Sequence, residues 1–174
     1  MQKDAKYTIF NTKWGYFGLA GTENSLCRAQ LPGPNREKIK SLLLKNLPTC
    51  QFDKNFCKKL QKQIIAYFEG DRVNFNGDIP LLLDGFTPFG ISVLKACKNV
   101  GYGHTTTYSR LAEKSGSPNA SRAVGSILAK NPLPLIIPCH RIIRNDGKLG
   151  GFTASGGITL KRKLLELEYE AFGF

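Results

Sequence analysis

The segment Thr106–Lys130, TTYSRLAEKSGSPNASRAVGSILAK, has the pattern of two short helices separated by a turn that contains glycine. Thr106 or Thr107 can cap a first helix that ends near Lys114. Ser117 followed by Pro118 combines a hydroxyl N-cap with proline at the first helical position, which predicts a second helix over 119–130. Two short helices joined by a tight turn form a helix-turn-helix, a motif that docks in a groove of DNA.

Small side chains dominate the second helix of this motif: Ala120, Ser121, Ala123, Gly125, Ser126 and Ala129. Such a helix can approach another surface closely, either DNA or the core of its own domain. Arg122 favours DNA, because a long cation among small neighbours can reach outward while the backbone stays close. The net charge of the chain, +12, also favours nucleic acid and, less strongly, an anionic membrane surface.

The remaining pattern predicts two domains within 174 residues. We expect an α/β domain over 1–79, a connection over 80–86, for which a short buried strand is the alternative, and a mostly α domain over 87–174. The first domain has strand patterns over 7–10, 14–20 and 26–31, and helix patterns over 35–45 and 52–69. In the second of these helices Asp53 is the expected N-cap and Gly70 the expected end. A further helix is expected over 88–100.

Composition argues against several classes of protein. Five cysteines form no C-x-x-C pair and only two histidines are present, so neither a disulfide framework nor a Cys/His zinc site is indicated. Together with the lack of an apolar leader-like segment at residues 1–6, this predicts a reducing, intracellular setting. No stretch approaches the ~20 apolar residues that span a membrane.

One cysteine stands out by its setting, Ile136-Ile137-Pro138-Cys139-His140-Arg141-Ile142-Ile143. A neighbouring imidazole or cation favours the thiolate, which is the nucleophilic form of cysteine. The alternative is an inert buried cysteine. Pro138 favours a strand end or a turn. Adjacent residues of an extended chain point to opposite faces, so Cys139 and His140 need a turn or a bridging water to cooperate.

These residues resemble a known family. Pro138-Cys139-His140-Arg141, preceded by 131–137 and combined with Tyr108, 121–125 and 149–152, is similar to the O6-alkylguanine-DNA alkyltransferases, also called methylated-DNA–protein-cysteine methyltransferases. The similarity runs from about residue 86 to 168. It implies a ribonuclease-H-like N-terminal α/β domain, with a small sheet and helices, and a mostly α, winged-helix-like C-terminal domain with the helix-turn-helix.

The resemblance implies DNA repair by direct reversal. An alkyl group would pass irreversibly from O6-alkylguanine, and from O4-alkylthymine, to Cys139 after the base has flipped out of the duplex. Each molecule would act once, as a suicide enzyme, with no metal and no cofactor. The expected partner is double-stranded DNA that contains alkylated bases. The expected protein is a cytoplasmic, nucleoid-associated or otherwise intracellular monomer that binds DNA singly or cooperatively, away from membranes.

The resemblance also implies roles for particular residues. The expected catalytic set is Cys139 as nucleophile, His140 as base through a water, Glu168 to polarise the imidazole, Tyr108 as donor to the base and Asn131 as a tie between the helix-turn-helix and the active-site segment. Glu166 and Glu170 are the alternatives to Glu168.

Arg122 would fill the space of the flipped base in the minor groove. DNA contacts are also expected from Thr107, Ala120, Ser121, Ala123 and Gly125. The expected substrate pocket contains Tyr108, Ile142, Thr153 and Ser155. Which of Thr153 and Ser155 matches the family's substrate-loop serine stays open, and Arg141 is expected to be structural or to face phosphate.

Three other functions compete with this hypothesis. A non-enzymatic reader of DNA lesions is disfavoured because Cys139 stands where such proteins typically have Trp. A cysteine hydrolase would have only His104 and His140 as bases, and no oxyanion-hole or triad pattern is recognisable. A helix-turn-helix transcription factor would explain the charge and Arg122 but not the Pro-Cys-His-Arg segment.

Overall fold

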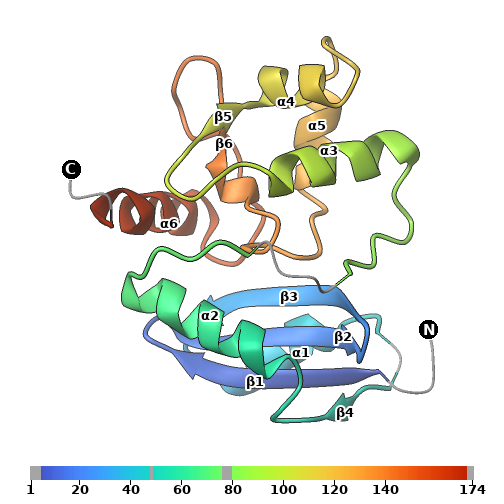
Figure 1. Ribbon diagram of the computed structural model, residues 1–174, viewed down its shortest axis with the longest axis vertical. Coiled ribbons are helices and arrows are strands. Elements are labelled where there is room, and N and C mark those ends of the chain that lie inside the picture. Colours follow the sequence, from blue (N-terminus) through green and yellow to red (C-terminus); the bar gives the residue numbers. More distant parts are fainter. Residues whose placement is uncertain (1–4, 48, 76–79, 172–174) are drawn as a thin grey trace. The chain divides into compact units, whose positions relative to one another are not determined.

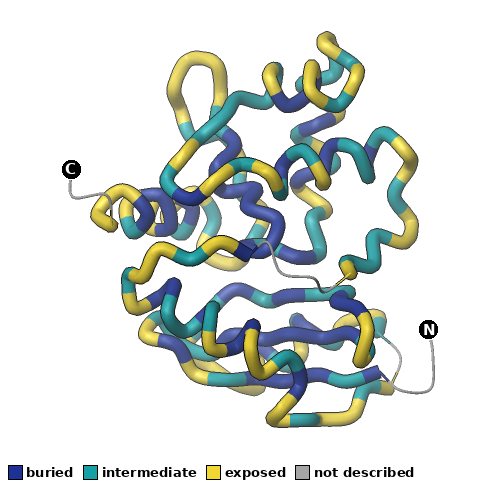
Figure 2. The backbone as a smooth tube through the Cα atoms, viewed as in Figure 1, coloured by how far each residue is buried: buried dark blue, intermediate teal, exposed yellow. Residues whose placement is uncertain are grey.

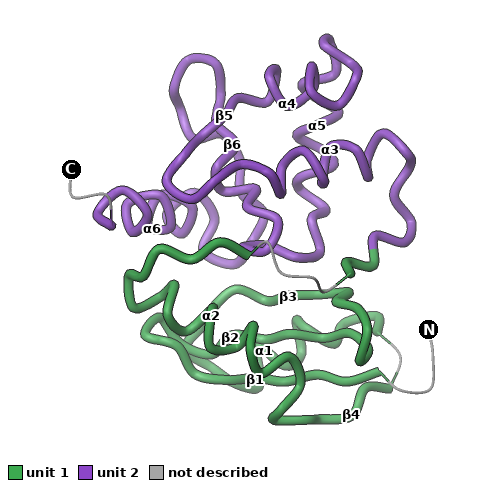
Figure 3. The backbone as a smooth tube through the Cα atoms, in the orientation of Figure 1, with its two compact units in different colours: residues 1–82 green, residues 83–174 purple. Residues whose placement is uncertain are grey.

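The chain forms two compact units, residues 1–82 and 83–174 (Figure 3). The computed structural model describes residues 5–47, 49–75 and 80–171. Residues 1–4 and 76–79, at the ends of the expected first domain, lie outside this description.

A four-stranded sheet is the centre of the first unit (Figure 1). Its strands are β1 (Lys6–Thr12), β2 (Gly15–Thr22), β3 (Ser25–Gly33) and β4 (Gln51–Phe52), in the order β3-β2-β1-β4. The first three strands form an antiparallel meander, whereas β4 runs parallel to β1. β2 is buried along most of its length because helices cover both faces of the sheet.

Alternate side chains of the strands contact different helices. Tyr7, Ile9 and Ala20 pack against Ile39 and Leu43 of α1 (Arg36–Leu44). On the opposite face, the rings of Trp14 and Phe17 contact Phe68 of α2 (Lys58–Glu69). Asn35 caps α1, since its side-chain oxygen accepts a hydrogen bond from Lys38 N at 2.9 Å.

The predicted helix over 52–69 begins later than expected, at Lys58. Gln51 N donates to the carbonyl of Ala5, just before β1, and Asp53 N donates to the carbonyl of Tyr7 in β1, each at 2.9 Å, which draws this segment into the sheet. Asp53 is not a helix cap, because its carboxylate accepts from Asn55 N at 2.8 Å and closes a local turn. Gly70 ends the helix as predicted, with φ 106°.

The segment around residue 81 pairs with β3 at one point. Leu26 N donates to Pro80 O at 2.9 Å and Leu82 N donates to Leu26 O at 2.7 Å. Residues 80–82 therefore belong to the first unit, and the chain enters the second unit at Leu83.

The second unit consists mainly of helices. These are α3 (Pro88–Lys98), α4 (Tyr108–Lys114), α5 (Ser121–Leu128) and α6 (Gly157–Glu170), with a 3₁₀ turn η1 (Cys139–Arg141) and a parallel pair of short strands, β5 (Thr106–Thr107) and β6 (Ile142–Ile143). α3, α4 and α5 pack on one another, and each carries fully buried apolar residues: Val93 and Leu94 on α3, Leu111 on α4 and Val124 on α5. Figure 2 colours the buried stretches of the backbone dark blue. None of the helices in the described ranges combines the length and the apolar character of a membrane span.

The helix-turn-helix is present, but its second helix starts at Ser121 rather than at 119. Ser117 is not its cap: the Ser117 carbonyl accepts from Ala120 N at 3.0 Å, so 117–120 forms a turn with Pro118 at its second position. Proline suits that turn position as well as it suits a helix start, which explains the wrong boundary. Thr107 caps α4 as predicted, since its hydroxyl accepts from Arg110 N at 3.3 Å. The expected fold class, an α/β unit followed by a helical unit with this motif, is confirmed.

Candidate active site

A tight backbone turn presents Cys139. Pro138 has φ −79° and ψ 64°, the geometry of an inverse γ-turn, and Cys139 N donates across it to Ile137 O at 2.8 Å. The 3₁₀ turn that follows is closed by a hydrogen bond from Arg141 N to Pro138 O at 2.9 Å. The expected turn at Pro138 is therefore present, and it places Cys139 and His140 in a geometry that an extended chain would not allow.

Asn131 fastens this turn and contacts the sulfur. Its side-chain Nδ2 donates to Ile137 O at 2.9 Å and to Cys139 Sγ at 3.2 Å, while its Oδ1 accepts from Leu133 N at 3.0 Å. Burial raises the pKa of the Cys139 thiol, and the Asn131 donor and the charge of Lys161 offset part of this effect. At neutral pH the resting side chain is therefore mostly the thiol, which needs a base to become nucleophilic.

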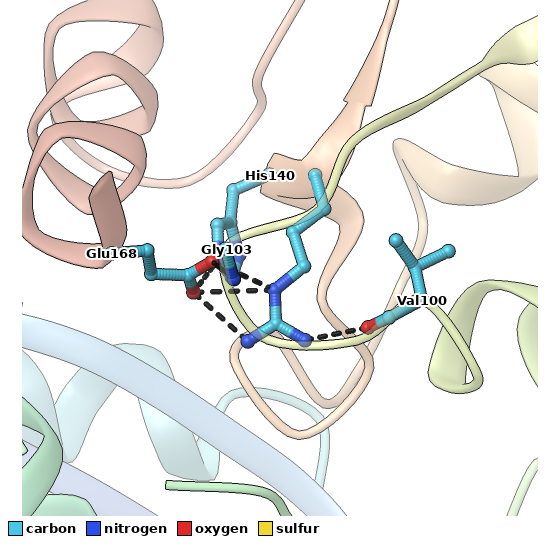
Figure 4. Close-up of polar contacts among 5 residues, drawn as sticks. Val100, Gly103, His140 and Glu168 are labelled. Atoms are coloured by element: carbon cyan, nitrogen blue, oxygen red, sulfur yellow. Dashed lines mark hydrogen bonds and ion pairs between the residues drawn. The ribbon is translucent and has the colours of Figure 1, made fainter. Parts of the chain in front are cut away.

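His140, Arg141 and Glu168 form a buried polar cluster between η1 and α6 (Figure 4). His140 Nε2 lies 2.8 Å from Glu168 Oε1. Arg141 donates from Nη2 and Nε to the carboxylate at 2.9–3.2 Å and from Nη1 to Val100 O at 2.6 Å. Gly103 N also donates to Glu168 Oε2, at 3.0 Å. Both carboxylate oxygens of Glu168 are thus held from several directions.

The charges of this cluster determine which His140 nitrogen can act as a base. Burial tends to raise the pKa of Glu168, but hydrogen bonds and charges from His140 and Arg141 outweigh it and lower the pKa to about 2. An ionised carboxylate can only accept, which assigns the imidazole proton to Nε2. Burial also lowers the pKa of His140, so the ring is neutral at pH 7. Its Nδ1 is buried and has no hydrogen-bond partner among the residues that the structure describes, so this lone pair is free to accept a proton.

Cys139 lies in the wall of a pocket of about 460 Å³, a volume typical of small-ligand sites. The other lining residues are Tyr108, Ser121, Gly125, Leu128, Ala129, Arg144, Gly150, Gly151, Phe152 and Thr153. Gly150 has φ +73°, and a β-carbon there would lie 2.9 Å from Tyr108 Oη, so the loop needs glycine at this close approach. Thr153 Oγ1 donates to Ala129 O at 2.9 Å, which ties the same loop to the end of α5.

A second pocket, also of about 460 Å³, shares Tyr108, Ser121 and Arg144 with the first. Its remaining lining residues are Ser109, Arg122, Asn145 and Asp146. Arg122 is exposed on the first turn of α5, and Arg144 Nη2 pairs with Asp146 at 3.1 Å. Two guanidinium groups beside hydroxyls suit a phosphate-rich partner.

The structure brings Cys139, His140, Glu168, Tyr108 and Asn131 into one site. Of the three candidate glutamates, Glu168 is buried against His140, whereas Glu166 and Glu170 are exposed. Arg141 is buried in the same cluster, so it has a structural position rather than one that faces phosphate.

The pocket and helix residues lie in more varied positions. Of the four expected pocket residues, Tyr108 and Thr153 line the pocket. Ser155 does not line it and is exposed, and Ile142 does not line it because it is buried in β6. On α5, Ser121 and Gly125 border the pocket and Ala123 is exposed, while Ala120 precedes the helix and Thr107 caps α4.

Sequence reasoning missed Lys161, a fully buried cation on α6. Its Nζ donates to Ile142 O at 2.6 Å and, less closely, to Gly151 O at 3.5 Å, and it lies 5.8 Å from the centre of the Tyr108 ring. Burial lowers the pKa of Lys161 to about 8. A usable signal was its spacing: Lys161, Leu164, Leu165 and Glu168 recur on one face of the helix.

No group of three or more His, Cys, Asp or Glu side chains within the described ranges is arranged to hold a metal ion.

Comparison with known proteins covers both units. A family model described as 6-O-methylguanine DNA methyltransferase, ribonuclease-like domain, matches residues 5–83, and one described as the DNA binding domain of the same family matches residues 88–170. A methylated-DNA–protein-cysteine methyltransferase of Methanosarcina acetivorans is 36% identical over 163 residues, which are 93% of this chain and 97% of that protein.

Solved structures give the same result. A crystal structure of Mycobacterium tuberculosis O6-methylguanine methyltransferase superposes with a TM-score of 0.76 and 32% identity over 96% of this chain and 94% of that chain. A crystal structure of Mycobacterium tuberculosis OGT in complex with DNA has a TM-score of 0.77 and 33% identity, and covers 95% of this chain and 94% of that chain.

Proposed function

This chain belongs to the 6-O-methylguanine DNA methyltransferase family, and from that premise we propose that it moves alkyl groups from guanine O6 in DNA to Sγ of its own Cys139. One observation carries the assignment to Cys139. Its sulfur lies in the wall of a pocket and accepts from Asn131 at 3.2 Å, while the next residue, His140, is held by Glu168 at 2.8 Å with Nδ1 free.

The first step prepares the nucleophile. Because burial raises the pKa of Cys139, the thiol must lose its proton to a base. The adjacent residue, His140, offers the buried lone pair of its Nδ1 atom for this purpose. A water molecule between Sγ and Nδ1 would carry the proton. The ionised Glu168 stabilises the imidazolium that forms, and Asn131 donates to the developing thiolate.

The second step is a displacement at the alkyl carbon. The Sγ–C bond forms as the C–O6 bond breaks, and the electron pair of that bond remains on the guanine. Tyr108 can donate a hydrogen bond and then its proton to the leaving base. Burial raises the pKa of its hydroxyl, so the proton is present at neutral pH and the tyrosinate readily takes one up again. The proton taken from the thiol then restores the tyrosine. The thioether product contains no leaving group that would regenerate the thiol, so each molecule acts once.

Access to the pocket requires the nucleotide to leave the duplex, since O6 of a stacked guanine lies at its pairing edge. The exposed Arg122 lines the second pocket, which adjoins the pocket of Cys139, and it can fill the space that the base vacates. Small residues on α5 permit a close approach to the narrow minor groove. The net charge of +12 favours the phosphate backbone.

The same pocket and donor would accept O4-alkylthymine, whose alkylated oxygen also lies at the pairing edge. We further propose that the protein is a monomer that binds double-stranded DNA singly or cooperatively, and that it acts in the cytoplasm at the nucleoid or elsewhere inside the cell.

The test is the intact mass of the protein after incubation with a duplex that contains one O6-methylguanine. We expect a gain of one methyl group per molecule, mapped to Cys139, and no gain in a folded Cys139→Ala variant that still binds the lesion. Methyl transfer by Cys139→Ala would refute the assignment. Binding of the lesion by the unmodified protein without any gain in mass would refute the transfer itself.

A further inference from the structure

Lys161 is a buried charge that the proposed reaction does not use. It is fully buried, and the contacts of its Nζ are the carbonyls of Ile142 and Gly151 and the face of the Tyr108 ring. Within the described part of the chain, no carboxylate forms an ion pair with it. Carbonyl dipoles solvate an ammonium but do not neutralise it, and an uncompensated buried charge is unfavourable.

The other ionisable groups around the site leave this charge unbalanced. They are Cys97 on α3, Tyr102 beside Arg141, Tyr108 on α4, Cys139, His140 and Arg141 on η1, and Glu168 on α6. Arg144 also lines the pocket, and Asp146 balances its charge. Arg141 and Glu168 neutralise each other through several hydrogen bonds. His140 is neutral because burial lowers its pKa, and Tyr108 keeps its proton. Lys161 therefore remains the unbalanced charge of this cluster while Cys139 is a thiol.

Two thiols could supply the missing negative charge, and the local contacts favour Cys139. Burial raises the pKa of Cys97 well above its usual range, and the charges of Arg141 and Lys161 offset only part of this effect. Among the described residues, no hydrogen bond to the Cys97 sulfur stabilises its thiolate. Cys139 also has a raised pKa, but the Asn131 amide and the backbone N–H groups of Cys139 and His140 stabilise its anion. The cluster approaches neutrality when the proton leaves Cys139.

We propose that Lys161 is the buried counter-charge of the Cys139 thiolate, a positioning residue that stabilises the nucleophile from behind the pocket wall. The proposal rests on the proposed function in so far as Cys139 is the nucleophile. The location of Lys161 fits this role, because its three contacts lie close to Cys139. Ile142 adjoins the turn that carries Cys139, and Gly151 and Tyr108 line the same pocket as Cys139. The interaction is reciprocal: the ammonium lowers the pKa of the thiol, and the thiolate raises the pKa of Lys161.

The experiment uses iodoacetamide as a small probe of the thiolate and follows alkylation of Cys139 by peptide mass as a function of pH. An opposite charge nearby shifts a pKa by roughly 1 to 3 units. We therefore expect Lys161→Met to move the Cys139 pH–rate curve upward by at least about one unit, which slows alkylation at pH 7 about tenfold. Lys161→Arg keeps the charge and should stay near the original curve.

Lys163→Met is the matched control, because Lys163 lies on the same helix and is exposed. Its curve should overlay that of the unmodified protein. A purely structural lysine would lower the melting temperature of Lys161→Met without moving the curve. A folded Lys161→Met protein with an unchanged curve would overturn the proposal.

A second measurement covers the case in which Lys161→Met does not fold. The Lys161 side chain, labelled with ¹³C and assigned from the signal missing in Lys161→Arg, is titrated by NMR in the unmodified protein and in Cys139→Ser. Reciprocity requires the pKa of Lys161 to be lower when the thiol is absent. Identical titrations in the two proteins would overturn the proposal.

Neither measurement uses DNA, so the two hypotheses can fail separately. If the protein takes no methyl group from an O6-methylguanine duplex but Lys161→Met still shifts the iodoacetamide curve, the proposed function fails and the electrostatic role stands. If methyl transfer occurs but the curve does not shift, the opposite conclusion follows.

Discussion

Replacing Glu168 by glutamine should destabilise the protein strongly, and in a way that depends on pH. Glutamine keeps the shape of the side chain but removes the charge that Arg141 and His140 face, and its amide N–H groups would point at donors. The pKa of Glu168 is about 2, against 4.5 for an ordinary glutamate. This difference corresponds to roughly 3 kcal/mol of stability at pH 7, in line with the ~3–5 kcal/mol lost when a buried ion pair is broken.

The sign of the pH dependence follows from the lowered pKa. The contribution of Glu168 is complete above pH 4.5 and is lost as the pH falls through the folded value of about 2. By linkage it should be about 1.4 kcal/mol at pH 3. Because protonated glutamate resembles glutamine, the difference between the two proteins should shrink on acidification.

The assay is urea unfolding of the unmodified protein and Glu168→Gln at pH 7 and pH 3. Glu166→Gln is the control, because Glu166 is exposed on the same helix; its effect should stay within about 0.5 kcal/mol. A Glu168→Gln difference below about 1 kcal/mol at pH 7, or one that is equal at the two pH values, would refute the reasoning.

Three further substitutions test other parts of the site. Arg122→Ala should slow repair of duplex O6-methylguanine at least about tenfold, since flipping costs a few kcal/mol, yet leave reaction with free O6-benzylguanine unchanged. Arg110→Ala, at an exposed arginine of α4, is the control, and equal losses of Arg122→Ala on both substrates would contradict the finger role. Asn131→Ala removes the donor to Sγ and should slow iodoacetamide alkylation of Cys139 at pH 7 roughly tenfold, about 1.5 kcal/mol for a hydrogen bond to an anion; an unchanged rate would rule this donor out. Gly150→Ala should abolish transfer from O6-benzylguanine by displacing Tyr108 while iodoacetamide still reacts with Cys139, and transfer at the original rate would show that the close approach is not needed.

Much of the fold could be predicted from periodicity and caps. Thr107 caps α4 as predicted, because a side-chain oxygen one step before a helix has few better partners than the free N–H groups. The helix pattern over 35–45 is also confirmed, except that Asn35 caps α1 rather than belonging to it. The errors occur where a residue has two good local uses. Asp53 closes a turn instead of starting a helix, and Ser117-Pro118 forms a turn instead of capping α5.

The site was only partly predictable for a different reason. The position of Cys139 depends on the turn at Pro138, which the sequence indicates, but the contact of Asn131 with Sγ depends on the folded path of residues 131–138. That path includes Leu135 with φ 76°, a conformation that a leucine pattern does not predict. Lys161 was missed because lysine is rarely fully buried, and only tertiary packing shows that the Ile142 and Gly151 carbonyls receive it.

The neighbouring glycines of the pocket loop differ in what they would tolerate. A β-carbon at Gly150 would meet the Tyr108 hydroxyl, whereas one at Gly151 would meet no atom within 4 Å, and Gly151 does not require a left-handed backbone. Gly151 also lines the pocket. A new side chain there would extend the wall without disturbing the residues behind it, which makes this single position the natural place to engineer preference for alkyl groups of different size or polarity.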